Sequence, residues 1–145
     1  MHVLLVLYST LVLAYLNYGI LAWGNAPNIH MERMLLIQKR TRKIMNNTAF
    51  HSHTKVLFLI NKILKVHDLY YLNLGILMFQ LNIDMLLHAM ESLFFRNNQI
   101  HLYPTRQSEN LNLPFTRNVS SQKFLIFMGP KCWNELDTSL KQVTC

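Results

Sequence analysis

The side chains that could carry acid–base or metal chemistry are few in this chain of 145 residues. Its seven carboxylates, three Asp and four Glu, are scattered along the chain and no two are adjacent, so none of them indicates a catalytic or metal-binding pair. His51 and His53 are separated by one residue, and the two cysteines are Cys132 and Cys145, but these gaps match no zinc-site spacing. We therefore expect no catalytic residue, metal site or cofactor in this chain.

Positive charge is the more informative feature of the composition. Lys and Arg number 14 against seven acids, which gives a formal net charge of +7, and eight of the 14 cations lie between Arg33 and Lys65. Such an excess indicates a polyanionic partner, either nucleic acid or an anionic membrane surface. The alternative is a small basic protein whose charged side chains are simply hydrated at its surface. Apolar residues make up 51% of the chain, which indicates a packed structure and excludes a chain that is disordered as a whole.

The segment Val3–Trp23 contains no ionisable side chain other than tyrosine. Its length suffices for a membrane-spanning helix, and the basic cluster that follows it fits the flank of such a helix. Tyr15 and Tyr18, however, lie inside the segment, whereas interfacial anchors belong at the ends of a span. Two interpretations stay open: a helix buried on most sides in a larger protein, or a membrane anchor followed by a basic juxtamembrane helix.

The next segment, Met31–Met45, predicts a helix that ends at Asn46-Asn47, because Asn tolerates the left-handed conformation of a helix cap. One stripe at helical spacing is predicted to be its packed side, and comprises Met34, Ile37, Thr41, Ile44 and Met45. Four cations lie on the remaining circumference: Lys39, Arg40, Arg42 and Lys43. Cations on one helix can contact successive phosphates of a nucleic acid, so we expect this helix to be the binding surface.

The remaining pattern predicts a mainly α protein, a small helical bundle with a long irregular loop at about 97–118 and a short C-terminal strand or helix. Asp68 is the expected N-cap of a helix over Leu69–Asn82. Ser121–Met128 is expected to be a short element, either a strand or a helix, and Gly129-Pro130 is expected to end it. The other predicted helices are Thr54–Ile60, Met85–Phe95 and Cys132–Leu140.

Four short blocks, in order along the chain, carry a family resemblance. They are Leu7–Gly24, the basic stretch Leu36–Ile44, His101–Gln107 with a Tyr-x-Thr-Arg motif, and Gly129–Leu136 with the pattern Gly-Pro-x-x-Trp-Asn-x-Leu. Together they resemble the region downstream of the polymerase core in jockey-like non-LTR retrotransposon reverse transcriptases. The chain departs from the family at two positions, where Ala14 and Pro104 stand in place of the more frequent Pro and Asn.

The resemblance implies a helical thumb-like region over residues 1–95 and a loop-rich C-terminal region over residues 96–145 packed on it. It also implies weak, sequence-independent contact with primer–template nucleic acid through the basic helix. Arg106, in the family-like loop, is a further candidate contact, and the alternative for it is pairing with the C-terminus of a helix. The family's palm domain holds Mg²⁺ with paired aspartates, but no Asp-Asp pair occurs here. We therefore expect a chain without polymerase activity of its own, poorly soluble because it lacks the palm, and located in the nucleus or cytoplasm.

Overall fold

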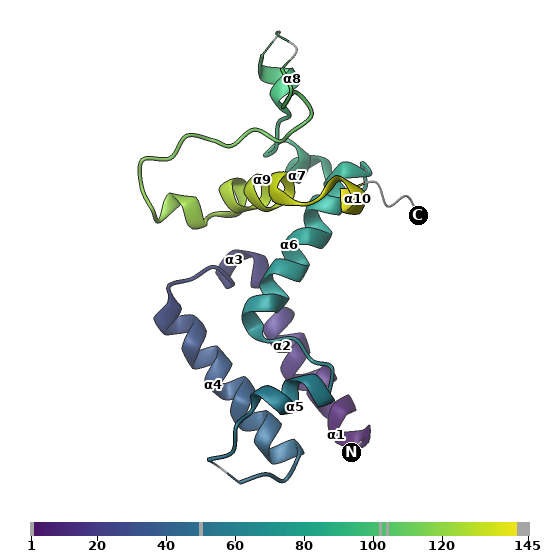
Figure 1. The fold of residues 1–145 in the computed structure, drawn as a ribbon, viewed down its shortest axis with the longest axis vertical. Coiled ribbons are helices and arrows are strands. Elements are labelled where there is room, and N and C mark those ends of the chain that lie inside the picture. Colours follow the sequence, from purple (N-terminus) through teal and green to yellow (C-terminus); the bar gives the residue numbers. More distant parts are fainter. Residues whose placement is uncertain (1, 50, 102, 104, 142–145) are drawn as a thin grey trace. The chain divides into compact units, whose positions relative to one another are not determined.

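The structure is a computed structural model that describes residues 2–49, 51–101, 103 and 105–141. It is mainly helical, as predicted (Figure 1). The chain divides into two compact units, Met1–Leu72 and Asn73–Cys145. The division falls inside α6 (Val66–Asn82), a single helix whose first turns belong to one unit and whose later turns belong to the other.

The first unit opens with a continuous helical run of three elements, α1 (His2–Leu7), the π-helical η1 (Tyr8–Leu13) and α2 (Ala14–Asn17). Within η1 the hydroxyl of Thr10 donates to the carbonyl of Val6 at 2.9 Å, a side-chain bond that competes with the regular helical ladder. The run ends before Gly19, whose φ of 62° is left-handed, and α3 (Ile20–Trp23) follows.

Most of this N-terminal run is exposed within its unit. Its buried side chains among the described residues are Tyr8 and Leu16, whereas Val3, Leu11 and Tyr15 are 67–73% exposed. The expectation of burial on most sides is therefore not met by this unit itself. No helix in the described part of the chain is both long enough and apolar enough to cross a membrane.

The basic helix α4 spans Asn28–Met45 and begins directly after Pro27, three residues earlier than predicted. Its predicted end is confirmed, because Asn47 is left-handed with a φ of 47°. The backbone N–H of Thr48 donates to the carbonyl of Lys43 at 3.1 Å, which satisfies a carbonyl that the helix end would otherwise leave open.

The packed side of α4 is not the predicted one. Ile37 and Ile44 are 53% and 79% exposed. The buried side follows a different stripe, which comprises Met31, Leu35, Gln38, Arg42 and Met45. The prediction was wrong because Gln38 is hydrogen-bonded inside the unit and Arg42 packs against aromatic rings there. With these two side chains inward, the apolar Ile37 and Ile44 face solvent.

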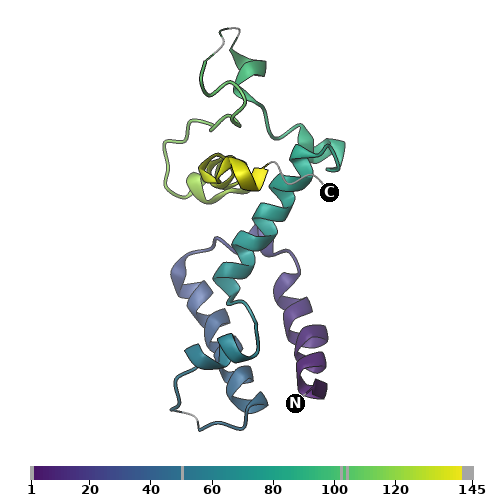
Figure 2. The ribbon, with the colours of Figure 1, turned by 45° about the vertical axis from the view of Figure 1, so that its right-hand side comes forward.

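After α5 (Lys55–Ile60), α6 begins at Val66, so Asp68 lies in its first turn. The prediction that Asp68 caps this helix is therefore wrong. The cap comes from another helix instead, since the backbone N–H of Val66 donates to Oε1 of Gln38 at 3.1 Å. Figures 1 and 2 show this junction of the N-terminal run, α4 and the start of α6.

The second unit contains short elements between α6 and its main helix, α9 (Leu125–Glu135). The helix predicted over Met85–Phe95 is wrong for most of its length, since the structure has one turn there; Asp84, left-handed with a φ of 54°, precedes it. Among its described residues the predicted loop begins with a single helical turn, has an isolated antiparallel bridge at Leu111 and is otherwise irregular. The remaining elements are α7 (His88–Glu91), α8 (Asn97–Ile100), the 3₁₀ turn η2 (Ser121–Lys123) and α10 (Thr138–Lys141).

Gly129 and Pro130 do not break α9, which contradicts the sequence prediction. A Cβ built on Gly129 would lie 2.7 Å from Sδ of Met78 and 3.3 Å from the ring of Phe94, so the glycine lets α9 approach its neighbours closely. The core of this unit is a cluster of four buried residues, Met78, Phe94, Leu111 and Trp133.

Candidate nucleic-acid interface

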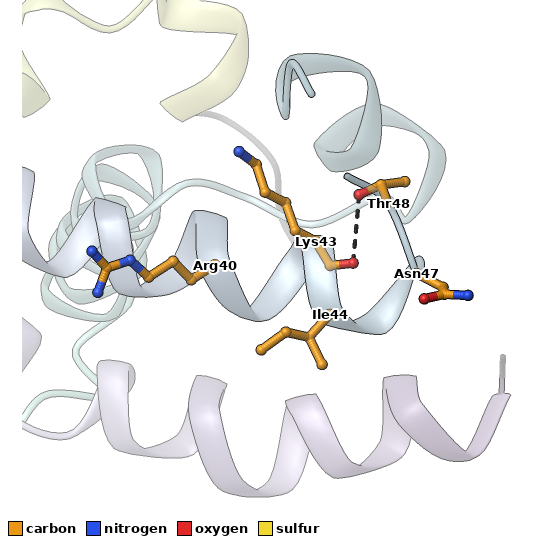
Figure 3. Close-up of a pocket in the computed structure, with 5 residues that line it drawn as sticks. All are labelled: Arg40, Lys43, Ile44, Asn47 and Thr48. Carbon is orange, nitrogen blue, oxygen red and sulfur yellow. Dashed lines mark hydrogen bonds between the residues drawn. The ribbon is translucent and has the colours of Figure 1, made fainter. Parts of the chain in front are cut away.

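Three of the four predicted cations of α4 reach solvent: Arg40 is exposed, and Lys39 and Lys43 are half-buried. We call these three residues the α4 basic surface. Arg40 and Lys43 line a shallow hollow of about 420 Å³ near the end of the helix, together with Ile44, Asn47 and Thr48 (Figure 3). The turns of α4 from Leu35 to Met45 contain no carboxylate, and the one acid in the sequence of this helix, Glu32, comes seven residues before Lys39.

Arg42 does not belong to this surface, which corrects the sequence prediction. Its side chain is fully buried, with Cζ 3.9 Å from the ring centroid of Tyr8 and 5.7 Å from that of Phe58. Two of its guanidinium nitrogens, Nε and Nη2, have no hydrogen-bond partner among the described residues. Burial lowers the pKa of Arg42 below its usual value, although the contact with Tyr8 opposes this. In this position Arg42 packs against aromatic rings and is closed to a phosphate.

Gln38 fixes the orientation of α4 in the unit. Its Nε2 donates to Oη of Tyr8 at 2.9 Å and to the carbonyl of Leu64 at 2.8 Å, while its Oε1 accepts from Val66. A fully buried glutamine needs such partners, because an unpaired amide in the interior is costly. These bonds hold the buried stripe inward and thereby direct Arg40 outward.

Arg33 is a cation that sequence reasoning missed. It is exposed on α4, seven residues before Arg40. Seven residues are about two helical turns, or roughly 10 Å along the axis, so Arg33 and Arg40 lie on nearly the same line of the helix. This spacing of seven was the signal available in the sequence.

Arg106 is exposed and belongs to the other unit, Asn73–Cys145. It lines a hollow with four polar residues of the surrounding loop, Asn97, His101, Thr105 and Gln107.

The candidate metal ligands are not brought together. Within residues 2–49, 51–101, 103 and 105–141, no three His, Cys, Asp or Glu side chains are grouped so that they could hold a metal ion. His51 and His53 are both exposed. Cys132 is half-buried, and burial together with the nearby Glu135 raises the pKa of its thiol. Cys145 lies outside the described residues.

Models of protein families, curated proteins and solved structures were each compared with this chain, and none of them matches it.

Proposed function

We propose that this chain is the thumb and post-thumb region of a jockey-like retrotransposon reverse transcriptase, and that its α4 basic surface contacts primer–template nucleic acid. The observation that carries the proposal is the segregation of charge. The unit Met1–Leu72 has eight cations and two acids, whereas Asn73–Cys145 has six cations and five acids.

The α4 basic surface suits a phosphate backbone better than a particular base sequence. Its cations lie within five residues of one helix, from Lys39 to Lys43, and the exposed Arg33 extends the line by two turns. Contacts of this kind release condensed counterions and give weak, sequence-independent affinity that falls steeply with salt.

The exposed apolar side chains of the first unit support a second partner, the palm domain of the parent protein. Leu11 of η1 and Leu59 of α5 are 67% and 71% exposed. Large apolar side chains exposed to this degree suit a face that packs against another protein region. In this proposal the palm supplies the paired aspartates and Mg²⁺, and the chain does not synthesise DNA by itself.

Binding is tested with the full chain and a fluorescein-labelled primer–template duplex, followed by fluorescence anisotropy. The variant Lys39→Gln, Arg40→Gln, Lys43→Gln is expected to lose most of its affinity. A control, Lys55→Gln, Lys62→Gln, Lys65→Gln, removes the same charge from exposed residues of the same unit and is expected to retain most of it. Equal losses in the two variants would contradict the proposal.

The absence of polymerase activity is tested by primer extension with Mg²⁺ and all four deoxynucleotides. No template-dependent product is expected from the isolated chain. The family assignment is tested in the DNA upstream of the coding sequence, which is expected to encode an Asp-Asp palm in an open or broken frame. Either a template-dependent product or upstream DNA without a palm would refute the corresponding part of the proposal.

A further inference from the structure

The second unit contains a hairpin, formed by residues 95–98 and 108–112, whose two sides are joined by backbone hydrogen bonds. Arg96 and Leu111 form an antiparallel bridge. On one side of it the backbone N–H of Asn112 donates to the carbonyl of Phe95 at 2.7 Å, and on the other side two more backbone bonds, at 3.0 Å each, continue the pairing from Asn97 and Asn98. The hairpin therefore holds the two ends of the loop 99–107 together.

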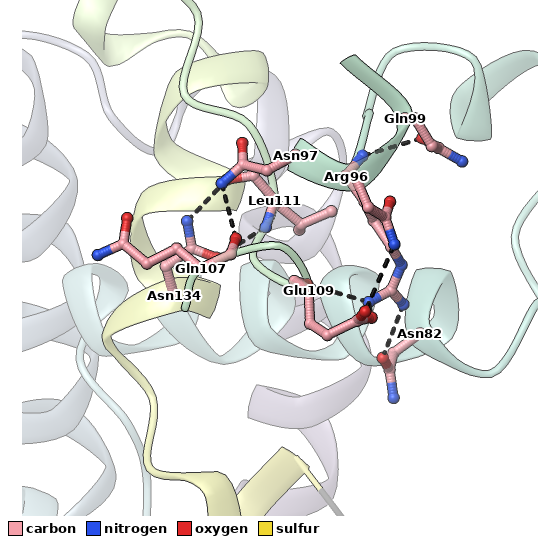
Figure 4. Close-up of polar contacts among 9 residues, drawn as sticks. Asn82, Arg96, Asn97, Gln99, Gln107, Glu109, Leu111 and Asn134 are labelled. Atoms are coloured by element: carbon pink, nitrogen blue, oxygen red, sulfur yellow. Dashed lines mark hydrogen bonds and ion pairs between the residues drawn. The ribbon is translucent and has the colours of Figure 1, made fainter. Parts of the chain in front are cut away.

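Asn134 of α9 anchors the base of this hairpin (Figure 4). Its Oδ1 accepts from the backbone N–H of Leu111 at 3.0 Å, and its Nδ2 donates to the carbonyl of the same residue at 2.8 Å. The side chain of Leu111 is 4% exposed and lies in the core cluster with Trp133. The Trp-Asn pair of the C-terminal motif thus ties the hairpin to the core through both its side chains.

Glu109 is the only carboxylate in the sequence of this hairpin, and it is already engaged. Its Oε2 lies 3.8 Å from Nη1 of Arg96, and Nδ2 of Asn98 donates to its Oε1 at 3.4 Å. Arg96 is held in turn by Asn82, whose Oδ1 accepts from Nη2 at 3.2 Å. Glu109 therefore does not line the hollow that contains Arg106.

That hollow has a volume of about 440 Å³, and the described residues that line it carry polar side chains: Asn97, His101, Thr105, Arg106 and Gln107. Nδ2 of Asn97 donates to the carbonyl of Gln107 at 2.9 Å, so the two sides of the hollow are bonded to each other. In the same loop the ring of Tyr103 is 82% exposed.

We propose that this hollow is a second binding site, which takes single-stranded nucleic acid, with a phosphate on Arg106 and a base on the ring of Tyr103. A guanidinium group matches the geometry of phosphate oxygens, and the His101 and Thr105 side chains offer further donors. Stacking on Tyr103 requires an unpaired base, which a duplex does not offer. The inference rests on the proposed function for its ligand class, although it uses neither α4 nor the first unit.

The experiment measures the anisotropy of a fluorescein-labelled oligothymidylate, and of an abasic strand of equal length, with the full chain over a range of salt concentrations. Arg106→Gln is expected to flatten the slope of log affinity against log salt by about 0.7, the value for one phosphate contact in a single strand. Its control is Arg117→Gln, which removes another exposed arginine of the same unit outside the hollow and is expected to leave the slope unchanged.

Tyr103→Ala is expected to weaken binding of the oligothymidylate by at least about fivefold, and to leave binding of the abasic strand unchanged. Its control is Phe115→Ala, because Phe115 is 87% exposed and lies outside the loop. Equal effects of Arg106→Gln and Arg117→Gln, or of Tyr103→Ala and Phe115→Ala, would overturn the inference. So would a Tyr103→Ala effect that persists on the abasic strand.

The α4 variant separates this inference from the proposed function. If duplex binding is insensitive to Lys39→Gln, Arg40→Gln, Lys43→Gln while Arg106→Gln still flattens the single-strand slope, the proposed α4 contact fails and the hollow stands. The reverse pattern overturns the hollow alone. Circular dichroism of each variant establishes that the fold is retained in these comparisons.

Discussion

Replacing Gln38 by Met is expected to destabilise the first unit strongly, although Met has nearly the same volume and is a better helix former than most polar residues. The substitution removes three hydrogen bonds at once, to Tyr8, Leu64 and Val66. It also leaves the groups that were bonded to Gln38 without a partner. Two of these groups belong to residues that are almost inaccessible to water, since Tyr8 is 2% exposed and Val66 is 0% exposed.

The magnitude follows from those two buried groups. A buried donor or acceptor that loses its partner costs about 1–3 kcal/mol, so Oη of Tyr8 and the N–H of Val66 together account for about 2–6 kcal/mol. Leu64 is 43% exposed, and we assign its carbonyl no cost because water replaces the lost bond. The total is a large fraction of the stability of about 5–15 kcal/mol that is usual for a domain.

The assay uses the two tryptophans, one in each unit, Trp23 and Trp133. In a Trp133→Phe background the fluorescence of Trp23 reports urea unfolding of the first unit, and Gln38→Met is expected to lower the midpoint without a change in slope. Gln80→Met replaces an exposed helical glutamine and is expected to stay within about 0.5 kcal/mol of the parent. A loss below 1 kcal/mol for Gln38→Met would refute the assignment of Gln38 as the junction of the unit.

Three further predictions follow from the packing. Gly129→Ala is expected to destabilise the second unit by about 1–3 kcal/mol in urea unfolding, because its Cβ would meet Met78. Gly75→Ala, with open space around it, should instead stabilise α6 by about 0.5–1 kcal/mol. Equal effects of the two substitutions would contradict this packing. Arg42→Met is expected to raise the thermal midpoint of unfolding or leave it unchanged, since an uncompensated buried cation is removed. A decrease of more than about 1 kcal/mol in the free energy of unfolding would show that the stacking of Arg42 on Tyr8 outweighs the cost of desolvation. Burial raises the pKa of the Cys132 thiol, so its contribution to stability is present below the ordinary cysteine pKa and is lost as pH rises through the raised value. In a Cys145→Ser variant, alkylation of Cys132 by iodoacetamide should therefore reach half its maximal rate at a higher pH than alkylation of a short cysteine peptide with blocked termini, and a lower pH would contradict the assignment.

Features set by neighbouring residues were predictable from the sequence. The helices over α4, α5 and α6 follow from apolar spacing, and the left-handed cap at Asn47 follows from the tolerance of Asn for positive φ. The concentration of charge in the first unit is a property of composition and needed no structure.

Features set by distant residues were not predictable. The orientation of α4 depends on Gln38, whose partners lie 26 to 30 residues away in the sequence, at Tyr8, Leu64 and Val66. The continuation of α9 through Pro130 likewise accompanies close packing of Gly129 against Met78. Sequence periodicity treats a cation as solvated and so places Arg42 on the binding surface, whereas in the structure its guanidinium group packs against the rings of Tyr8 and Phe58.

The proposed contact of Lys39, Arg40 and Lys43 with a phosphate backbone makes duplex binding dependent on salt, and this dependence can be measured. If each cation contacts one phosphate, the variant Lys39→Gln, Arg40→Gln, Lys43→Gln should flatten the slope of log affinity against log salt by about 2.7. Between about 50 and 200 mM salt, affinity of the parent chain should then fall about 40-fold more than that of the variant. A slope that does not change, or that changes equally in the Lys55, Lys62, Lys65 control, would contradict the account.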